Sequence, residues 1–451
     1  MLIEILNGIT PFEAFEGLRG LHSPFFLTYG PVGNRYSAMS ADPRITIEAV
    51  HGTTTVEGGD FTEGVFKDPF EAASRILRLF KDREKGPLPF SVGGVGYFAY
   101  DLKDLIEPGR FHTHCSLHIP ECVFGFYDPV FIYRHRDGMG FLMSSDDDRA
   151  RLDEFKNLIL GSRGKLKESH VPKSPGFSSN MTKEEYIGAI LKAKEYISAG
   201  DIYQINLSQR LKIPYGGDPF ALYMELVKNS PAPYTFFLDY RGFKIISHSP
   251  ERLLKVKDCV LETSPIKGTR PRGNTPDEDA AMIEELKESI KERAEHVMIV
   301  DLERNDLGRV SEPGTVEVDG FESIETFPAL HHMVSTVRGR LRPGISAPEA
   351  LRAIFPGGSV TGAPKIRAME IIEELEPTSR GLYTGAVGWL DHTGNMDMAM
   401  AIRTAIYKDG FIYLNVGGGI VADSVPEDEY METLLKAKDF FDVLGISIPG
   451  D

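Results

Sequence analysis

The sequence predicts an α+β fold in which antiparallel β-sheets carry helices packed on their outside. The expected strands alternate apolar and polar residues, and tight turns such as DYRGFK (239–244) and YKDGFI (407–412) join several of them. Helices are not regularly interleaved between these strands, as the crossovers of a doubly wound parallel sheet would require.

The first 160 residues are predicted to be rich in strands. Short alternating segments separated by Gly, Asp and Pro turns occur at 44–50, 94–100 and 129–136. The stretch that follows, GSRGKLKESHVPKSPGFSSN at 161–180, has many Ser, Gly, Pro and Lys residues and few apolar ones, so it predicts a surface linker.

Helices and strands are both expected after this linker. Thr182 and Glu185 form a capping box that starts a helix, and Gly200 ends it. Strands are then expected at 203–212, 234–240, 243–248 and 252–262, followed by a long helix at 277–296. The last third repeats the mixture, with a helix at 347–355, strands at 384–390, 397–407 and 411–416, and a final helix at 427–444.

Composition argues against several kinds of partner. A formal charge of −16 disfavours binding to nucleic acid or to anionic lipid, which needs a basic face. No apolar run approaches the roughly 18 to 20 residues of a membrane span, and the N-terminus lacks a basic start and a cleavage site. The three cysteines are too few for a disulfide framework, so we expect a cytoplasmic protein.

A short cluster of histidines and cysteines lies in HTHCSLHIPEC at 112–122. It offers these possible zinc ligands: His112, His114, Cys115, His118 and Cys122. The spacing matches no standard zinc finger, and a solvated turn is the favoured interpretation.

Two expected helices each carry a pair of carboxylates three residues apart, Glu292 with Glu295 and Glu429 with Glu432. Residues at this spacing share a helix face. A single such pair is usually a solvated surface, but apolar residues follow both pairs here, which places them beside buried surface. Carboxylates from two helices, completed by water, suit Mg²⁺, and the ion would attract an anionic substrate.

Two glycine-rich segments, FPGGSVTGAPK at 355–365 and NVGGGIVADS at 415–424, are expected to be loops before helices. Free backbone N–H groups in such a loop are able to hold a carboxylate. Neither segment matches the phosphate-binding or dinucleotide-binding patterns, and a plain turn is the alternative.

Three single residues have two interpretations each. Arg403, in the apolar run MDMAMAIRTAIY, is either an exposed strand residue or a clamp for a carboxylate. Tyr383 is either core packing or a ligand. His332 is either a proton carrier or a satisfied polar core residue.

Seven motifs, in order along the chain, resemble the chorismate-utilising enzymes. They are SPERLL (249–254), SPIKGTRPRG (264–273), AEHVMIVDLERNDLGRV (294–310), FPGGSVTGAPK, SRGLYTGAVG (379–388), MAIRTA, and GGGIV with EDEYMETLLKA. GGVGYFAYD (93–101) resembles the N-terminal half of the same family. This resemblance implies a large antiparallel two-sheet β core with helices packed outside, to which 1–160 contributes, and a chorismate-binding catalytic region at 181–451.

The resemblance also implies a role for each motif residue. Glu295 and Glu432 resemble the family's Mg²⁺ ligands, and Glu292 and Glu429 its supporting carboxylates. Glu251 resembles the general acid that protonates the leaving C4 hydroxyl. The residues that resemble binders of substrate or match other active-site positions are Arg403, Tyr383, Gly417, Gly418, Gly419, Lys436, His332 and Thr269.

Two positions distinguish the branches of the family. Water-adding members have a lysine where this chain has Gln204, so isochorismate and salicylate synthesis are disfavoured. Anthranilate synthases usually have alanine where Lys267 stands, whereas PIKGT resembles aminodeoxychorismate synthase component I. Burial beside cations would lower the pKa of Lys267 and supply a free amine, which on this resemblance attacks C2 of chorismate.

The resemblance implies partners as well. None of the three cysteines lies in a glutaminase-like turn, so ammonia is expected from a separate glutamine amidotransferase subunit. The stretch 36–45 falls where some relatives hold tryptophan, although no pocket is evident from it. A non-catalytic chorismate-binding or tryptophan-binding relative is disfavoured, because such a protein would not need acid, nucleophile and metal ligands together.

Overall fold

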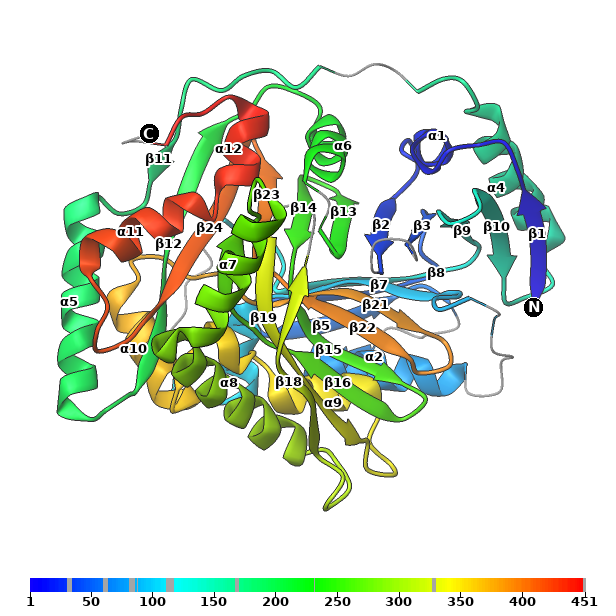
Figure 1. Ribbon diagram of the computed structural model, residues 1–451. Coiled ribbons are helices and arrows are strands. Elements are labelled where there is room, and N and C mark those ends of the chain that lie inside the picture. The colour runs from blue at the N-terminus through cyan, green and yellow to red at the C-terminus, as the bar shows by residue number, and fades with distance from the viewer. Residues whose placement is uncertain are drawn as a thin grey trace.

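The computed structural model describes residues 1–30, 35–59, 64–80, 86, 88–110, 117–166, 170–230, 232–326 and 330–448. In this part of the chain, two large antiparallel sheets lie face to face with helices on their outer faces (Figure 1). The predicted α+β fold is confirmed.

The first sheet has twelve strands, and all of its described pairings are antiparallel. Their order is β1 (Leu2–Leu6), β10 (Met139–Ser144), β9 (Val130–Arg134), β3 (Tyr36–Ser40), β2 (Phe25–Tyr29), β13 (Tyr234–Tyr240), β14 (Phe243–Ser249), β23 (Thr404–Lys408), β24 (Phe411–Ile420), β12 (Gln204–Pro214) and β11 (Ser178–Ser179), with β20 (Gly362–Ala363) also paired to β12.

The second sheet also has twelve strands and is antiparallel throughout its described pairings. Their order is β17 (Ile266–Pro271), β19 (Leu330–Arg340), β16 (Val260–Ser264), β15 (Arg252–Lys257), β22 (Met396–Met400), β21 (Ala386–Asp391), β7 (Gly93–Phe98), β8 (Cys122–Tyr127), β4 (Ile45–Val50), β5 (Thr53–Glu57) and β6 (Gly64–Phe66), with β18 (Glu317–Thr326) paired to β19.

Strands from both sides of 161–180 make up each sheet. β2 pairs with β13 in the first sheet, and β7 pairs with β21 in the second. The helices are α1 (Pro11–Glu16), α2 (Pro69–Leu79), α3 (Lys103–Ile106), α4 (Arg149–Gly161), α5 (Lys183–Ala199), α6 (Pro219–Asn229), α7 (Pro276–Glu288), α8 (Ile290–Gly308), α9 (Ala347–Ile354), α10 (Lys365–Leu375), α11 (Pro426–Leu435) and α12 (Lys438–Leu444).

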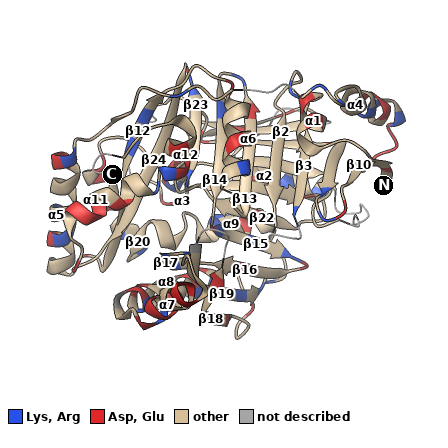
Figure 2. Cartoon of the chain, turned by 45° about the horizontal axis from the view of Figure 1, so that its top comes forward, with Lys and Arg blue, Asp and Glu red and all other residues tan. Residues whose placement is uncertain are grey.

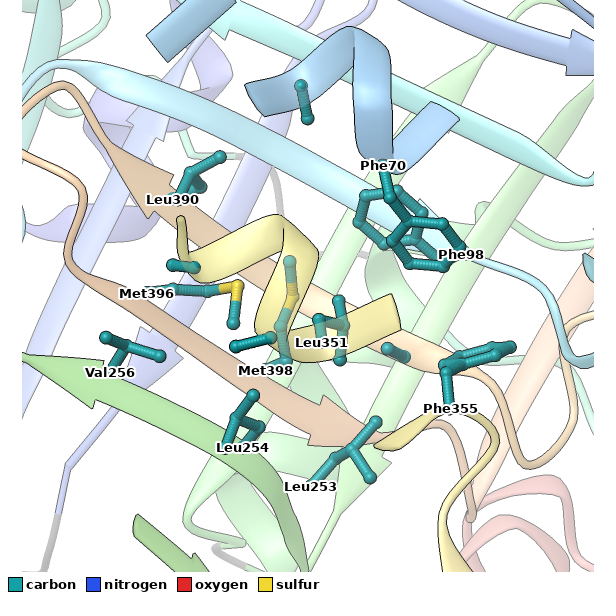
Figure 3. Close-up of a cluster of buried hydrophobic side chains, with 14 of the residues drawn as sticks. Phe70, Phe98, Leu253, Leu254, Val256, Leu351, Phe355, Leu390, Met396 and Met398 are labelled. Atoms are coloured by element: carbon teal, nitrogen blue, oxygen red, sulfur yellow. The ribbon is translucent and has the colours of Figure 1, made fainter. Parts of the chain in front are cut away.

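The core is layered because alternate strand residues point to opposite faces. In β2, Phe25 and Leu27 join the cluster between the sheets, whereas Phe26 joins the cluster under α1, α4 and α6. A third cluster lies under α2 and α9, where Phe70 and Phe98 stack with ring centroids 4.6 Å apart (Figure 3). Each such buried ring stabilises the fold by roughly 1.5 to 3 kcal/mol.

Most predicted elements match the structure to within a few residues at their ends. The helix after Thr182 begins with the expected capping box and ends at Gly200, whose φ of 81° is left-handed. No helix in the described part of the chain is both long and apolar enough to cross a membrane.

Two predicted elements are wrong because a turn interrupts them. The helix expected at 277–296 is two helices, since Ser289 caps the start of α8 by accepting a hydrogen bond from the Glu292 N–H. The strand expected at 252–262 is the hairpin β15–β16. Its turn residues Asp258 and Cys259 both have positive φ, as a two-residue hairpin turn requires.

Two further predictions are wrong because each treats as one element a segment that forms two elements in the structure. The strand expected at 397–407 is β22 in one sheet and β23 in the other, and the chain changes sheets at Arg403, whose φ is 47°. The last helix is divided between Lys436, which caps the end of α11, and Ala437, which caps the start of α12, so α11 and α12 are separate.

Candidate active site

Lys267 lies in β17, where its backbone pairs with Met333 of β19. Its side chain is half-buried, and burial lowers the pKa of the amine. Nearby charges act in both directions: Glu295 raises this pKa, Lys436 lowers it, and Glu251 and Glu432 raise it, with a net lowering. The fold therefore brings the amine under the influence of a carboxylate from α8 and another from α11.

The glycines expected in a loop lie in a strand instead. Gly417, Gly418 and Gly419 belong to β24 and pair with residues 206–208 of β12, so this segment is not a loop of free N–H groups. On the other side of β24, β23 pairs only as far as Leu414 among the described residues. Beyond that point Lys436 Nζ donates a 2.9 Å hydrogen bond to the Gly417 carbonyl.

These glycines leave room for the side chains gathered over them. A Cβ at Gly419 would lie 2.5 Å from Gln204 Nε2 and 3.8 Å from Lys267 Nζ. A Cβ at Gly418 would lie 3.3 Å from Glu429 Oε2 and 3.8 Å from Lys436 Nζ, and one at Gly417 would lie 2.7 Å from the Tyr383 hydroxyl. The side chains of Gln204, Lys267, Glu429, Lys436 and Tyr383 thus all lie close to the glycine segment of β24, residues 417–419, which we call the glycine strand.

Glu251 immediately precedes β15 and is 7% exposed. Burial raises the pKa of its carboxyl to about 7, against the hydrogen bond from Ser359 and the charges of Lys267 and Lys436, which lower it. The Ser359 hydroxyl donates to Oε1 at 2.9 Å. A carboxyl with this pKa is suited to donate a proton near neutral pH.

His332 of β19 lies opposite Thr269 of β17, with His332 Nδ1 2.8 Å from the Thr269 hydroxyl. His332 is buried and Thr269 is exposed. Burial, together with the charge of Arg403, lowers the pKa of His332 to about 4. The imidazole is therefore neutral at pH 7 and acts there as a hydrogen-bonding group.

Three of the four carboxylates in the two predicted pairs have partners of different kinds. Arg270 donates to Glu292 Oε1 at 2.9 Å, and Glu292 Oε2 is buried with no hydrogen-bond partner in the described part of the chain. Ser424 donates to the buried Glu429 at 2.6 Å, and Glu432 pairs with Lys436 at 2.7 Å. Figure 2 shows the acidic residues along α8 and α11 in red.

Arg403, Tyr383 and Gln204 border the same region. Arg403 lies in the connection between β22 and β23 rather than in a strand, and its Nη1 is 3.5 Å from Asp439 Oδ2. Tyr383 is buried, with its hydroxyl beside Gly417. Gln204 is 1% exposed, and its Oε1 has no hydrogen-bond partner among the described residues.

Sequence comparison assigns the family. The model of chorismate binding enzymes matches residues 24–442, which is nearly the whole chain. The chain belongs to the chorismate-binding enzyme family. The resemblance inferred from the motifs is confirmed at this level.

Relatives of this chorismate-binding enzyme carry two different names. Anthranilate synthase component 1 of Aquifex aeolicus is 44% identical over 82% of this chain and 78% of its own. Aminodeoxychorismate synthase component 1 of Bacillus subtilis is 39% identical over 94% of this chain and 92% of its own. The family is shared, but the names of these relatives differ in the reaction they state.

Solved structures show the same fold. Anthranilate synthase component I from Streptococcus pneumoniae TIGR4 superimposes with a TM-score of 0.80 at 33% identity, covering 91% of this chain and 93% of that one. The menaquinone-specific isochorismate synthase from Escherichia coli has a TM-score of 0.74 at 17% identity, covering 98% and 95%, and shows the fold alone.

The donors at this site fit Mg²⁺ if the substrate completes the shell. No three His, Cys, Asp or Glu side chains among the described residues form a group able to hold a metal by themselves. Mg²⁺ usually takes only one or two protein carboxylates and completes its shell with water and substrate oxygens. The orphaned Glu292 Oε2 is one such donor, and Glu295 and Glu432 both act on the Lys267 amine.

The zinc cluster considered from the sequence falls mostly on residues 111–116, which lie outside the described part of the chain. Of its five members, His118 and Cys122 are described. Cys122 is fully buried in β8, where burial raises the pKa of its thiol.

The sequence did not point to several polar residues around the site. Glu303 and Asp306 are buried one turn apart on α8, and Lys365 Nζ pairs with Asp306 at 2.6 Å. Burial raises the pKa of Glu303 to about 8. Ser359, the hydrogen-bond partner of Glu251, lies in one of the two glycine-rich segments. Its position in that segment is the signal from which the sequence could have indicated it.

Proposed function

We propose that this enzyme converts chorismate and ammonia to 4-amino-4-deoxychorismate through a covalent adduct on Lys267. The observation that carries the proposal is the pairing of opposite pKa shifts. The pKa of the Lys267 amine is lowered and that of the neighbouring Glu251 carboxyl is raised to about 7. Both shifts favour the uncharged form, so they increase the share of unprotonated nucleophile and of protonated acid near neutral pH.

The proposed reaction has two displacements that together conserve the substrate's double bonds. The Lys267 amine forms a bond to C2 as the C4 hydroxyl departs as water with a proton from Glu251. The new secondary ammonium returns a proton to Glu251. Ammonia then forms a bond to C4 and the Lys267 amine leaves C2, taking up the proton that the incoming nitrogen loses. The sum is chorismate plus ammonia giving the product plus water.

The remaining residues would bind and orient the substrate. Arg403 and Lys436 would supply positive charge to the carboxylates of the substrate. Tyr383 and the backbone of 417–419 would line the substrate-binding site. Gln204 is proposed to bind at the ring, and Thr269 with neutral His332 to donate or accept hydrogen bonds there. Glu295 and Glu432, with Glu292 and Glu429 supporting them, would hold Mg²⁺, which supplies positive charge to a substrate carboxylate.

Ammonia is proposed to come from glutamine through a separate amidotransferase subunit. The support is chemical: the described cysteines are Cys122, buried in β8, and Cys259, in the turn after β15. Burial raises the pKa of the Cys122 thiol, and Cys259 is exposed in a two-residue hairpin turn, whereas glutamine hydrolysis needs a thiolate activated within a catalytic site. Supplying ammonium salt would then replace the partner in an assay.

The second candidate is anthranilate synthase, which the 44% identity to the Aquifex aeolicus protein favours. Product analysis separates the two. The chain is incubated with chorismate, Mg²⁺ and ammonium, and the products are resolved by chromatography with mass and fluorescence detection. We expect aminodeoxychorismate, which keeps its enolpyruvyl group. Anthranilate as the sole product would overturn the proposal.

A further inference from the structure

Arg403 occupies a backbone position that arginine seldom adopts. Its φ of 47° lies in the left-handed region, where a residue with a Cβ is strained. The position is the point at which the chain leaves β22 of one sheet and enters β23 of the other. The His248 N–H donates a 3.0 Å hydrogen bond to the Arg403 carbonyl, which holds the backbone in place.

The guanidinium is held from a third element. Asp439, on α12, places Oδ2 3.5 Å from Arg403 Nη1 and 3.6 Å from Nδ1 of the same His248. α12 lies beside the ends of β14 and β23 (Figure 1). Burial would raise the pKa of Asp439, but the adjacent His248 side chain and the charge of Arg403 lower it below its ordinary value. The carboxylate is therefore ionised at neutral pH.

His248 is itself fixed. It is 1% exposed, and its Nε2 contacts the carbonyl of Ser230 at the end of α6. Since a carbonyl only accepts, Nε2 is the donor in that contact. The ring is thus locked by one hydrogen bond, and its other nitrogen faces the Asp439 carboxylate.

We propose that Asp439 is a positioning residue that orients the Arg403 guanidinium toward a carboxylate of the substrate. Asp439 engages one of the three guanidinium nitrogens, which leaves the others to make a two-point contact with an anion. An arginine side chain without such a hold samples many rotamers, and fixing it beforehand lowers the cost of binding. Both side chains are about a quarter exposed, so the pair acts through orientation rather than through fold stability.

The inference rests on the proposed function only in taking Arg403 as a substrate binder. We therefore test it by chorismate binding in the presence of Mg²⁺, measured by calorimetry, which does not depend on the product formed. Asp439→Asn removes the charge at constant size. Asp442→Asn is the matched control, because Asp442 lies on the same helix in an exposed ion pair with Lys438 at 3.0 Å.

We expect Asp439→Asn to weaken chorismate binding about tenfold and Asp442→Asn to leave it within about twofold of wild type. In an Arg403→Ala background, Asp439→Asn should have no further effect, since the residue it positions is gone. An equal effect in both backgrounds, or no difference from the control, would overturn the inference. If Asp439→Asn does not fold, as judged by thermal unfolding, Asp439→Ser is measured with the same expectations.

Discussion

The Ser359 hydroxyl donates a 2.9 Å hydrogen bond to Oε1 of the buried Glu251, and this contact favours the ionised carboxylate. Removing it in Ser359→Ala should raise the pKa of Glu251 further above its present value of about 7. Because the proposed acid would act in its protonated form, the alkaline limb of the profile of kcat/KM against pH should move to higher pH. Ser178→Ala, an exposed serine in β11, should leave the limb in place. If the alkaline limb of the kcat/KM profile is unchanged in Ser359→Ala, or moves to lower pH, Glu251 is not the general acid.

Glu251 also makes the fold less stable at high pH. Its pKa rises from the ordinary 4.5 to about 7 on folding, so the stability present below pH 4.5 declines as pH rises and is lost by pH 7. Two and a half pKa units correspond to about 3 kcal/mol. Glu251→Gln should therefore raise the free energy of unfolding in urea by roughly that amount at pH 8 and by little at pH 4. The exposed Glu284→Gln on α7 is the control, and an equal gain at both pH values would speak against the assignment.

A substitution at Gly419 tests whether the closeness of Gln204 and Lys267 to the glycine strand matters for activity. An alanine Cβ there would lie 2.5 Å from Gln204 Nε2, and the end of that flexible side chain is able to move away. We expect Gly419→Ala to fold but to lose at least about tenfold in kcat/KM, because the displaced amide enters the space beside Lys267. Gly188→Ala, in α5 with no atom of the described residues within 4 Å of the new Cβ, should keep full activity. Full activity in Gly419→Ala would contradict the proposal that Gln204 and Lys267 contact the same bound substrate.

The two helices should contribute jointly to Mg²⁺ binding. Glu295→Gln and Glu432→Gln should each raise the Mg²⁺ concentration that gives half-maximal activity by about tenfold or more, since Mg²⁺ prefers charged oxygens. A magnesium titration of the steady-state rate measures this directly. Glu427→Gln, exposed on α11, supplies the control. An unchanged requirement in Glu295→Gln and Glu432→Gln would show that the ion, if needed, binds elsewhere.

Local sequence rules predicted the elements they govern and failed where distant parts of the chain decide. The capping box at Thr182 and the stop at Gly200 are short-range, so they were found. The change of sheet at Arg403 was missed because the apolar run continues through it, and only pairing with β14 and β15 shows which strand belongs where. The same applies to Asp439 and Ser359, whose partners lie far away in the chain. Lys267 could be predicted only from the family resemblance. The charged groups that act on its amine belong to α8, to α11 with its capping residue and to the residue before β15, and the residues next to Lys267 in the sequence do not indicate them.

The central claim is that the Lys267 amine bonds to the substrate. We would mix the enzyme with chorismate and Mg²⁺ without ammonia, quench it, and examine the peptide containing Lys267 by mass spectrometry. The account predicts an added mass equal to chorismate less water on Lys267, removed when ammonium is supplied before the quench, and absent in Lys267→Ala, which should still bind chorismate. An unmodified Lys267 throughout turnover, with aminodeoxychorismate made at the normal rate by Lys267→Ala, would contradict it.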